Sequence, residues 1–260
     1  MADNAENGTA KLPVSISIIT LNEEGRLPAC LESVSFADDI VVLDSGSTDR
    51  TQEVARSFGA RVFSEEWRGF GPQKQRAMEL CKYNWVLMID ADEVLGDGAR
   101  DEIAAVLQAP GAEAYSLRRR GYIGGRAIRH SGWWPDRVVR LVDRRRCRVE
   151  GSIHESVKVD GRTAELMSLI HHFSFRDYSH MIEKLNSYSD LTSDRLLREG
   201  RRAGALAPFT HGLLMFLRTY ILRRGFMDGL DGLVISSLSA AGTFFKYAKL
   251  LDKRRQRDEG

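Results

Sequence analysis

Two aspartates separated by one residue, Asp90 and Asp92, follow an apolar run that reads Trp-Val-Leu-Met-Ile from residue 85. Two carboxylates at the end of a buried strand can both turn towards one bound cation. Their hard oxygen ligands suit Mg²⁺ or Mn²⁺, which can in turn bridge the phosphates of a nucleotide. The ordinary alternative is a solvated acidic turn, because acidic residues are common after strands. The pattern gains weight if it closes a strand of an α/β sheet.

Two further polar segments follow apolar strands in the same way. Asp44 opens the sequence DSGSTD after the run Ile-Val-Val-Leu. Its carboxylate could accept a hydrogen bond from a base N–H, with the nearby hydroxyls as further polar contacts. The alternative is an Asx turn that caps the next helix. The segment Thr20-Leu-Asn22-Glu23 has the same ambiguity.

The elements that must position these segments alternate along the first ninety residues. Apolar runs predict strands at 14–20, 40–43, 60–63 and 85–89, and the intervening patterns predict helices at 27–34, 51–58 and 72–81, the second with Ser or Thr as N-cap. This order is typical of a doubly wound α/β sheet, in which ligands bind beyond the carboxyl ends of the strands. All three polar segments lie at such ends, so we expect them to meet.

Composition is compatible with a globular protein of 260 residues, with 43% hydrophobic and 28% charged residues and a net charge of +2. The three cysteines show no CxxC spacing, which favours a reducing compartment. The first dozen residues are polar and resemble a loose tail rather than a secretory signal. No run approaches the ~20 apolar residues needed to cross a bilayer. These features predict a cytoplasmic location.

The C-terminal pattern is helical from residue 178. Residues 209–251 interleave apolar blocks such as 213–217 with basic clusters such as 223–224, and a further basic cluster, 253–255, follows. Amphipathic basic helices bind anionic membrane surfaces, at about 1 kcal/mol per well-placed Lys or Arg. The alternative is a helical pair that packs on the rest of the chain or forms an oligomer. Nucleic acid is disfavoured, because aliphatic blocks rather than base-stacking aromatics separate the basic residues.

Taken together, these motifs resemble the family 2 glycosyltransferases. The segments that carry the resemblance are ITLNEE, VVLDSGSTDRT, GFGPQKQRA, WVLMIDADE and GSIHESV. Within that family they are similar to bacterial lipopolysaccharide-core glucosyltransferases of the heptose-linked type. The resemblance covers about residues 14–191. It implies a GT-A fold, Rossmann-like with a mostly parallel sheet, and a C-terminal helical extension that associates with membranes.

The resemblance also implies roles for individual residues. A UDP-sugar would lie between the first two loops, with Thr20, Asn22 and Glu23 along the base and ribose and Asp44 paired with uracil. Lys74 and Arg76 would face the nucleotide. Asp90 would lie near the ribose or the metal, and Asp92 would bind the metal, Mg²⁺ or Mn²⁺. The expected organisation is a flexible tail at 1–12, a nucleotide-sugar half at 13–113, an acceptor half at 114–177 and a helical region at 178–260.

An inverting transfer also needs a general base for the acceptor hydroxyl. Relatives often place it in an ED pair, whereas this chain offers His154-Glu155, so Glu155 is the predicted base, with His154 orienting it or contacting phosphate. Asp136 is the second candidate. Other residues could bind diphosphate, complete the metal shell or stack on a sugar, although each has an ordinary structural alternative: Arg140, His171, His172, Trp133 and Trp134. The QxxRW motif of processive members is absent, which favours single-sugar addition.

The sequence therefore leaves three hypotheses about function. The first is transfer of glucose from UDP-glucose to a lipid-linked saccharide such as a lipopolysaccharide inner core, with polyprenyl phosphate as a variant acceptor. The second is a nucleotidyltransferase, although such enzymes normally carry a Gly-rich basic loop where this chain has NEEG. The third is a silent nucleotide-sugar binding module, against which the intact Asp90-Ala-Asp92 and Glu155 argue. For the first, we expect a peripheral protein on the inner face of the cytoplasmic membrane.

Overall fold

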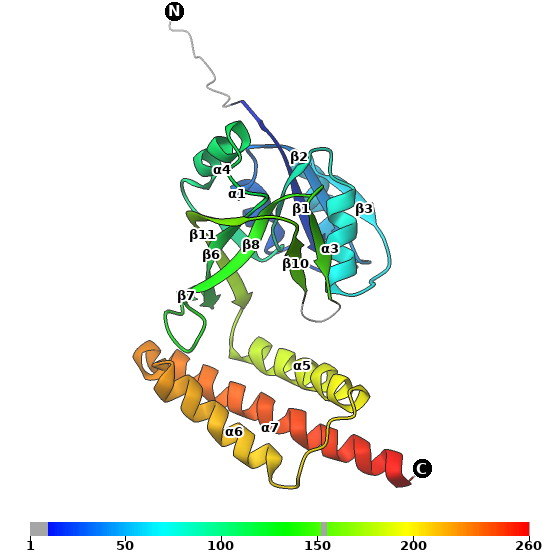
Figure 1. Ribbon diagram of the computed structural model, residues 1–260, viewed down its shortest axis with the longest axis vertical. Coiled ribbons are helices and arrows are strands. Elements are labelled where there is room, and N and C mark those ends of the chain that lie inside the picture. The colour runs from blue at the N-terminus through cyan, green and yellow to red at the C-terminus, as the bar shows by residue number, and fades with distance from the viewer. Residues whose placement is uncertain (1–9, 152–154, 260) are drawn as a thin grey trace, which may run out of the picture. The chain divides into compact units, whose positions relative to one another are not determined.

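The computed structural model describes residues 10–151 and 155–259 (Figure 1). By its internal contacts the chain divides into two units, Met1–Arg119 with Arg137–His172, and Arg120–Asp136 with Phe173–Gly260. This division differs from the boundaries expected after residues 113 and 177. The difference arises because strands within 137–172 hydrogen-bond to strands of the N-terminal half and belong to the same sheet.

The N-terminal half forms the predicted alternation of strands and helices. The strands are β1 (Leu12–Thr20), β2 (Ala37–Asp44), β3 (Arg61–Ser64) and β4 (Trp85–Met88), and the helices are α1 (Leu27–Ser33), α2 (Thr51–Ser57) and α3 (Phe70–Glu79). The four strands lie side by side in the order β3-β2-β1-β4, and each neighbouring pair is parallel. The carboxyl ends of β1, β2 and β4 therefore share one edge of the sheet.

Beyond β4 the sheet becomes mixed. Its order continues β8-β6-β11-β5, formed by β8 (Asp136–Asp143), β6 (Ala114–Ile123), β11 (Thr163–Phe175) and β5 (Glu93–Leu95), and β7 (Arg126–Ala127) pairs with β6. The β4–β8 and β5–β11 pairings are antiparallel. Helix α4 (Ala99–Gln108) follows β5, and β9 (Cys147–Glu150) and β10 (Ser156–Val159) form a separate antiparallel pair. The sequence led us to expect a mostly parallel sheet, and the parallel strands account for only one half of it.

Alternating side chains of the central strands fill two cores. Val42, Leu87 and Ile16 belong to one buried cluster, whereas Val41 and Val86 belong to the other. A strand with both faces buried needs a continuous apolar run, which is what the sequence provides at β2 and β4. Each such side chain contributes roughly 1.5–3 kcal/mol by its removal from water. This burial fixes the strand ends, and with them the polar loops that follow.

The second unit is mainly helical. It contains α5 (Tyr178–Arg198), α6 (Ala207–Leu217), the π-helical turn η1 (Arg218–Leu222), the 3₁₀ turn η2 (Gly225–Asp228) and α7 (Gly229–Glu259). Helix α5 begins where predicted, because the side chain of Asp177 accepts a hydrogen bond from the backbone of His180 at 2.8 Å. Helix α7 packs against both α5 and α6 (Figure 1). Within the described residues, none of the helices combines the length and apolar character that a membrane-spanning segment needs.

Candidate active site

Three strand ends bring the predicted polar segments together. Thr20 and Asp44 are register partners at the ends of β1 and β2, and Asp90 follows β4 on the other side of β1. The expectation that these segments share one edge of the sheet is therefore confirmed in geometry.

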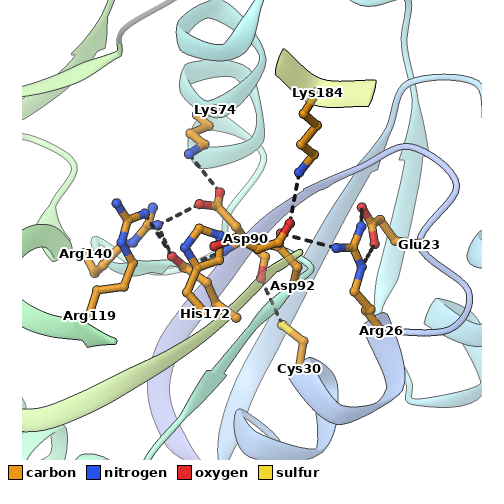
Figure 2. Close-up of polar contacts among 12 residues, drawn as sticks. Glu23, Arg26, Cys30, Lys74, Asp90, Asp92, Arg119, Arg140, His172 and Lys184 are labelled. Carbon is orange, nitrogen blue, oxygen red and sulfur yellow. Dashed lines mark hydrogen bonds and ion pairs between the residues drawn. The ribbon is translucent and has the colours of Figure 1, made fainter. Parts of the chain in front are cut away.

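Asp90 lies between two cations (Figure 2). The Nζ of Lys74 on α3 is 2.8 Å from its Oδ1, and Nη2 of Arg140 on β8 is 2.7 Å from its Oδ2. Burial raises the pKa of Asp90, but the charges of Arg140 and Lys74 outweigh burial and hold the pKa well below its usual range. Asp90 is thus ionised at neutral pH, with both oxygens engaged by the chain itself.

Arg140 also binds Glu93, a residue that the sequence did not single out. Its Nη2 is 2.5 Å from Oε1 of Glu93, whose side chain is fully buried, and Arg119 approaches the same oxygen at 3.4 Å. Burial lowers the pKa of Arg140, but the charges of Asp90 and Glu93 raise it by more, so the net pKa lies above its usual range and the charge is permanent. The run Asp-Ala-Asp-Glu after an apolar strand was the available signal, since a carboxylate held at a buried strand end requires a cation.

Asp92 faces a different set of groups. Nη1 of Arg26 lies 3.6 Å from Oδ2 of Asp92, and Nε2 of His172 lies 3.4 Å from Oδ1. Arg26 also holds Glu23 through a bidentate pair, with Nη2–Oε1 at 2.6 Å and Nε–Oε2 at 2.7 Å. Burial raises the pKa of Asp92, but the hydrogen bond and charge of His172 outweigh it and the net pKa is lowered. Arg26 thus connects the Asn22-Glu23 loop to the second aspartate, a role that the sequence analysis missed.

The donor atoms around Asp92 suit a divalent cation. A carboxylate oxygen and an imidazole nitrogen already approach each other there, and Mn²⁺ accepts both types of ligand. In the part of the chain that the structure describes, no group of three or more His, Cys, Asp or Glu could hold a metal ion. Mg²⁺ and similar ions are commonly held by one or two carboxylates together with substrate phosphates. Asp92 and His172 therefore fit a cation that shares its shell with a diphosphate, whereas the oxygens of Asp90 are engaged by Lys74 and Arg140.

Glu155 lies beside the same lysine. Nζ of Lys74 is 2.7 Å from Oε1 of Glu155, so one buried ammonium joins Asp90 to the predicted base. Burial raises the pKa of Glu155, but the charge and hydrogen bond of Lys74 outweigh it, leaving the pKa below its usual range. The two residues are far apart in sequence, and the structure nevertheless brings them into contact. His154 lies outside the described residues, and Asp136 begins β8 and groups with the other unit.

Asp44 organises the loop that it opens. Its Oδ1 accepts hydrogen bonds from the backbone N–H groups of Gly46 at 3.1 Å and Ser47 at 2.9 Å, and from Gln52 at 2.8 Å. Its Oδ2 accepts from the hydroxyls of Thr20, at 3.1 Å, and Ser47. Burial raises the pKa of Asp44, and these hydrogen bonds lower it by more. The carboxylate is fully engaged within the chain, so pairing with a uracil would displace one of these donors.

The Asn22-Glu23 segment is hydrogen-bonded to the same loop. The side chain of Asn22, whose φ is +56°, accepts from the backbone of Thr48 at 2.8 Å, and the backbone of Glu23 donates to Thr51 at 2.7 Å. Asp49 accepts from the backbone and hydroxyl of Thr51 at the start of α2. The helix therefore begins with Arg50 at its N-cap and with Asp49 bonding its first turn, rather than with the Ser or Thr cap expected from the sequence.

Arg76, unlike Lys74, lies outside the cluster around Asp90 and Asp92. It lies two positions after Lys74 on α3, which on a helix turns it towards the opposite side. Its Nε binds Glu65 at 2.8 Å, and its side chain is 41% exposed. Trp133 and Trp134 group with the second unit, where Arg120 lies 4.4 Å from the Trp134 ring centre.

The parallel strands with polar loops at their carboxyl edge, continued by antiparallel strands, define a GT-A fold. Residues 15–172 match the family model described as glycosyl transferase family 2, and the chain belongs to this family.

Relatives extend over nearly the whole chain. The chain is 33% identical over 253 residues to the lipopolysaccharide core biosynthesis glycosyltransferase LpsC of Rhizobium meliloti, covering 94% of this chain and 93% of LpsC. It is 31% identical to the uncharacterized glycosyltransferase RT0209 of Rickettsia typhi, covering 91% and 86%. Among solved structures, S. aureus TarS 1–349 in complex with UDP-GlcNAc aligns with a TM-score of 0.50 at 13% identity, covering 94% of this chain and 92% of that one. The protein is therefore a glycosyltransferase, which is the enzyme class of the first hypothesis.

Proposed function

We propose that this glycosyltransferase moves a single glucose, with inversion, from UDP-glucose to a lipid-linked saccharide of the lipopolysaccharide inner-core type. The observation that carries the proposal is the position of Lys74, whose ammonium contacts Asp90 at 2.8 Å and Glu155 at 2.7 Å. A donor-side carboxylate and a candidate base are thereby held at a single point. This arrangement supports transfer, because the acceptor oxygen must be deprotonated next to the anomeric carbon and so needs a base close to the donor.

On the donor side, we assign the base and ribose to the loops that follow β1 and β2, which are hydrogen-bonded to each other. Their lining residues are Thr20, Asn22, Glu23 and Asp44. The hydrogen bonds within these loops support the assignment, since a site that is rigid before binding loses less entropy on binding. We leave Arg76 out of the donor site because its guanidinium is engaged by Glu65.

Asp92 and His172 are the residues that we assign to the divalent cation. The chemistry that such an ion supplies is neutralisation of charge on the departing diphosphate. Asp90 is assigned to holding Lys74 and Arg140 in place. This assignment is supported by the engagement of both Asp90 oxygens, and it differs from the metal role expected for Asp90 from the sequence.

Glu155 is assigned as the general base. Lys74 favours its ionised form, so the carboxylate is ready to accept a proton at neutral pH. Its side chain is 29% exposed, which leaves it accessible to an acceptor hydroxyl. For the acceptor, the support is the similarity to LpsC along most of both chains.

An anionic membrane is the surface at which we place the reaction, on the cytoplasmic side. Large apolar side chains of α6, η1 and α7 are exposed, among them Leu213 at 61%, Leu222 at 77% and Leu230 at 66%. Residues 201–227 contain five arginines and no acidic residue. The next acids along the chain, Asp228 and Asp231, are paired with His130 and Arg126. An apolar surface with basic neighbours is the pattern of an interfacial membrane contact.

Vesicle binding tests this placement. Leu213→Glu should weaken co-sedimentation with phosphatidylglycerol-containing vesicles, whereas Leu191→Glu, at a 44% exposed leucine of α5, should not. Binding should also fall with salt, because the arginine contribution is screened. Equal sedimentation of both variants would remove the assigned surface.

The transfer reaction is tested with UDP-glucose and an inner-core acceptor. Asp92→Ala should abolish metal-dependent transfer. Glu155→Gln should abolish turnover while leaving UDP binding, measured by calorimetry, near that of the unmodified chain. Glu165→Gln is the matched control, since that side chain is 57% exposed and paired with Arg137. Full turnover by Glu155→Gln refutes its role as base, and undiminished transfer after chelation refutes the metal.

A further inference from the structure

A groove between α5 and α7 in the helical unit has no role in the chemistry described above. Its volume is about 350 Å³, within the range of small-ligand sites. Its lining is mainly apolar and includes Trp133, Phe175, Met181, Leu185, Ile235 and Leu238. Met181 and Ile235 also belong to the buried core of this unit, so the floor of the groove is fixed by packing.

The charges on the groove have a single sign. Among the described residues, the charged side chains that line it are Lys246 from α7 and Lys184 from α5, and none of them is acidic. The Nζ of Lys184 donates to the backbone oxygen of Ser174 at 3.2 Å, which leaves Lys246 as the candidate for an anion. Burial lowers the pKa of Lys246, and the charge of Arg195 lowers it further, so this ammonium lies in a setting that an anion would stabilise.

Two acids of α5 are bound to lysines of α7 further along the helices, and the third, Glu183, is exposed and does not line the groove. Asp190 binds Lys249 at 2.8 Å, and Asp194 binds Lys253 at 2.6 Å. These two pairs join the helices beyond the groove. Serine and threonine hydroxyls complete the lining, contributed by Ser189, Thr192, Ser239 and Thr243.

We propose that this groove binds an anionic lipid, with one alkyl or acyl chain along the apolar floor and its phosphate at Lys246. The occupant is the phosphorylated lipid that carries the acceptor saccharide, and in this respect the inference rests on the proposed function. Charge complementarity selects an anionic headgroup, and the apolar lining selects a hydrocarbon chain rather than a sugar.

Calorimetry with dodecyl phosphate below its micelle concentration tests the groove directly, without the transfer reaction. Gly242→Leu is the filling variant, because a Cβ at Gly242 would lie 3.5 Å from Leu185 Cγ, an ordinary contact, with the added side chain directed at the groove. Ser237→Leu is its control, since it adds the same side chain at an exposed position of α7 outside the lining. Lys246→Glu tests the headgroup, and Lys158→Glu on exposed β10 makes the same charge change elsewhere.

Dodecyl phosphate should bind saturably, one molecule per chain, while inorganic phosphate and dodecyltrimethylammonium should not. Gly242→Leu and Lys246→Glu should each weaken binding by about tenfold or more, and the two controls should leave it unchanged. Equal binding of the cationic detergent, or undiminished binding by both groove variants, would overturn the proposal. If the unmodified chain binds dodecyl phosphate but does not transfer glucose to the core acceptor, the proposed function is overturned and the lipid site in the groove is not.

Discussion

Replacement of Arg140 by methionine should destabilise the sheet unit, the first of the two units described above, because two buried carboxylates would lose their main cation. Arg140 is 5% exposed and binds Asp90 at 2.7 Å and Glu93 at 2.5 Å. Methionine retains much of the apolar stem and removes only the charge and its hydrogen bonds. The perturbation therefore isolates the electrostatic contribution of the guanidinium.

The magnitude follows from what remains after the replacement. Loss of one partner of a buried ion pair costs about 3–5 kcal/mol, and removal of the buried Nε of Arg140, which lacks a hydrogen-bond partner among the described residues, returns roughly 1 kcal/mol. Asp90 keeps Lys74, and Glu93 keeps Arg119 at 3.4 Å, which moderates the loss. We expect a net cost of about 2–4 kcal/mol, or a fall in Tm of roughly 4–16 °C for a chain of this size.

Thermal unfolding followed by circular dichroism measures this shift. Arg145→Met is the control, because Arg145 makes a similarly short pair with Asp143 at 2.6 Å but is 63% exposed, so that water screens its contribution. Adding Glu93→Gln to Arg140→Met should recover part of the lost stability, because it removes a buried charge that has lost its main cation. An Arg140→Met protein that melts with the unmodified chain, or a double variant that shows the full sum of both single losses, would refute the reasoning.

Two further predictions concern helix α3. Lys74→Met should move the acid limb of the kcat/KM profile to higher pH, because the lysine lowers the pKa of Glu155 while burial, which remains, raises it. Lys74→Arg keeps the positive charge and should leave the limb nearer its original position. An unmoved limb in Lys74→Met would contradict Glu155 as the titrating base. Gly71→Ala should destabilise the sheet unit by about 1–3 kcal/mol in denaturant unfolding, since its Cβ would lie 1.9 Å from the carbonyl oxygen of Gly151. Gly25→Ala, with nothing within 4 Å, should be neutral, and equal midpoints for the two would contradict the close approach.

The parallel half of the fold could be predicted because its strands are buried on both faces. An unbroken run such as residues 40–43 has few alternatives to a central strand, and the polar residues after it then mark the edge where ligands bind. The antiparallel half could not be predicted in detail. Strand β6 carries three consecutive arginines, 118–120, and its apolar residues follow no clear period, so only its place beside β8 and β11 explains its strand conformation.

The candidate site was predictable in its acids and less so in its cations. Asp44 and Asp90 follow apolar runs, and this spacing identified them. Arg26, Arg119 and Arg140 lie in unrelated stretches, and sheet pairing alone brings the last two to Glu93. The sequence named Arg140 only as a candidate for diphosphate or the metal shell, and a chain with many arginines gives no means of matching these three to their acids before the strand order is known.

The charges around the two aspartates lead to a last prediction about the donor. Among the described residues, the connected groups include these carboxylates and permanent cations: Glu23, Asp90, Asp92, Glu93 and Glu155, with Arg26, Lys74, Arg119 and Arg140. A diphosphate that entered alone would add negative charge beside these carboxylates, whereas a diphosphate with a divalent cation would add little. UDP and Mn²⁺ should therefore bind with positive coupling, each raising the affinity for the other by the same factor, as linkage requires. Calorimetric titrations of UDP with and without Mn²⁺, repeated on Asp92→Asn, measure that factor. It should fall towards one in the variant, and equal UDP affinity with and without Mn²⁺ in the unmodified protein would show that the site balances the diphosphate charge with its own cations.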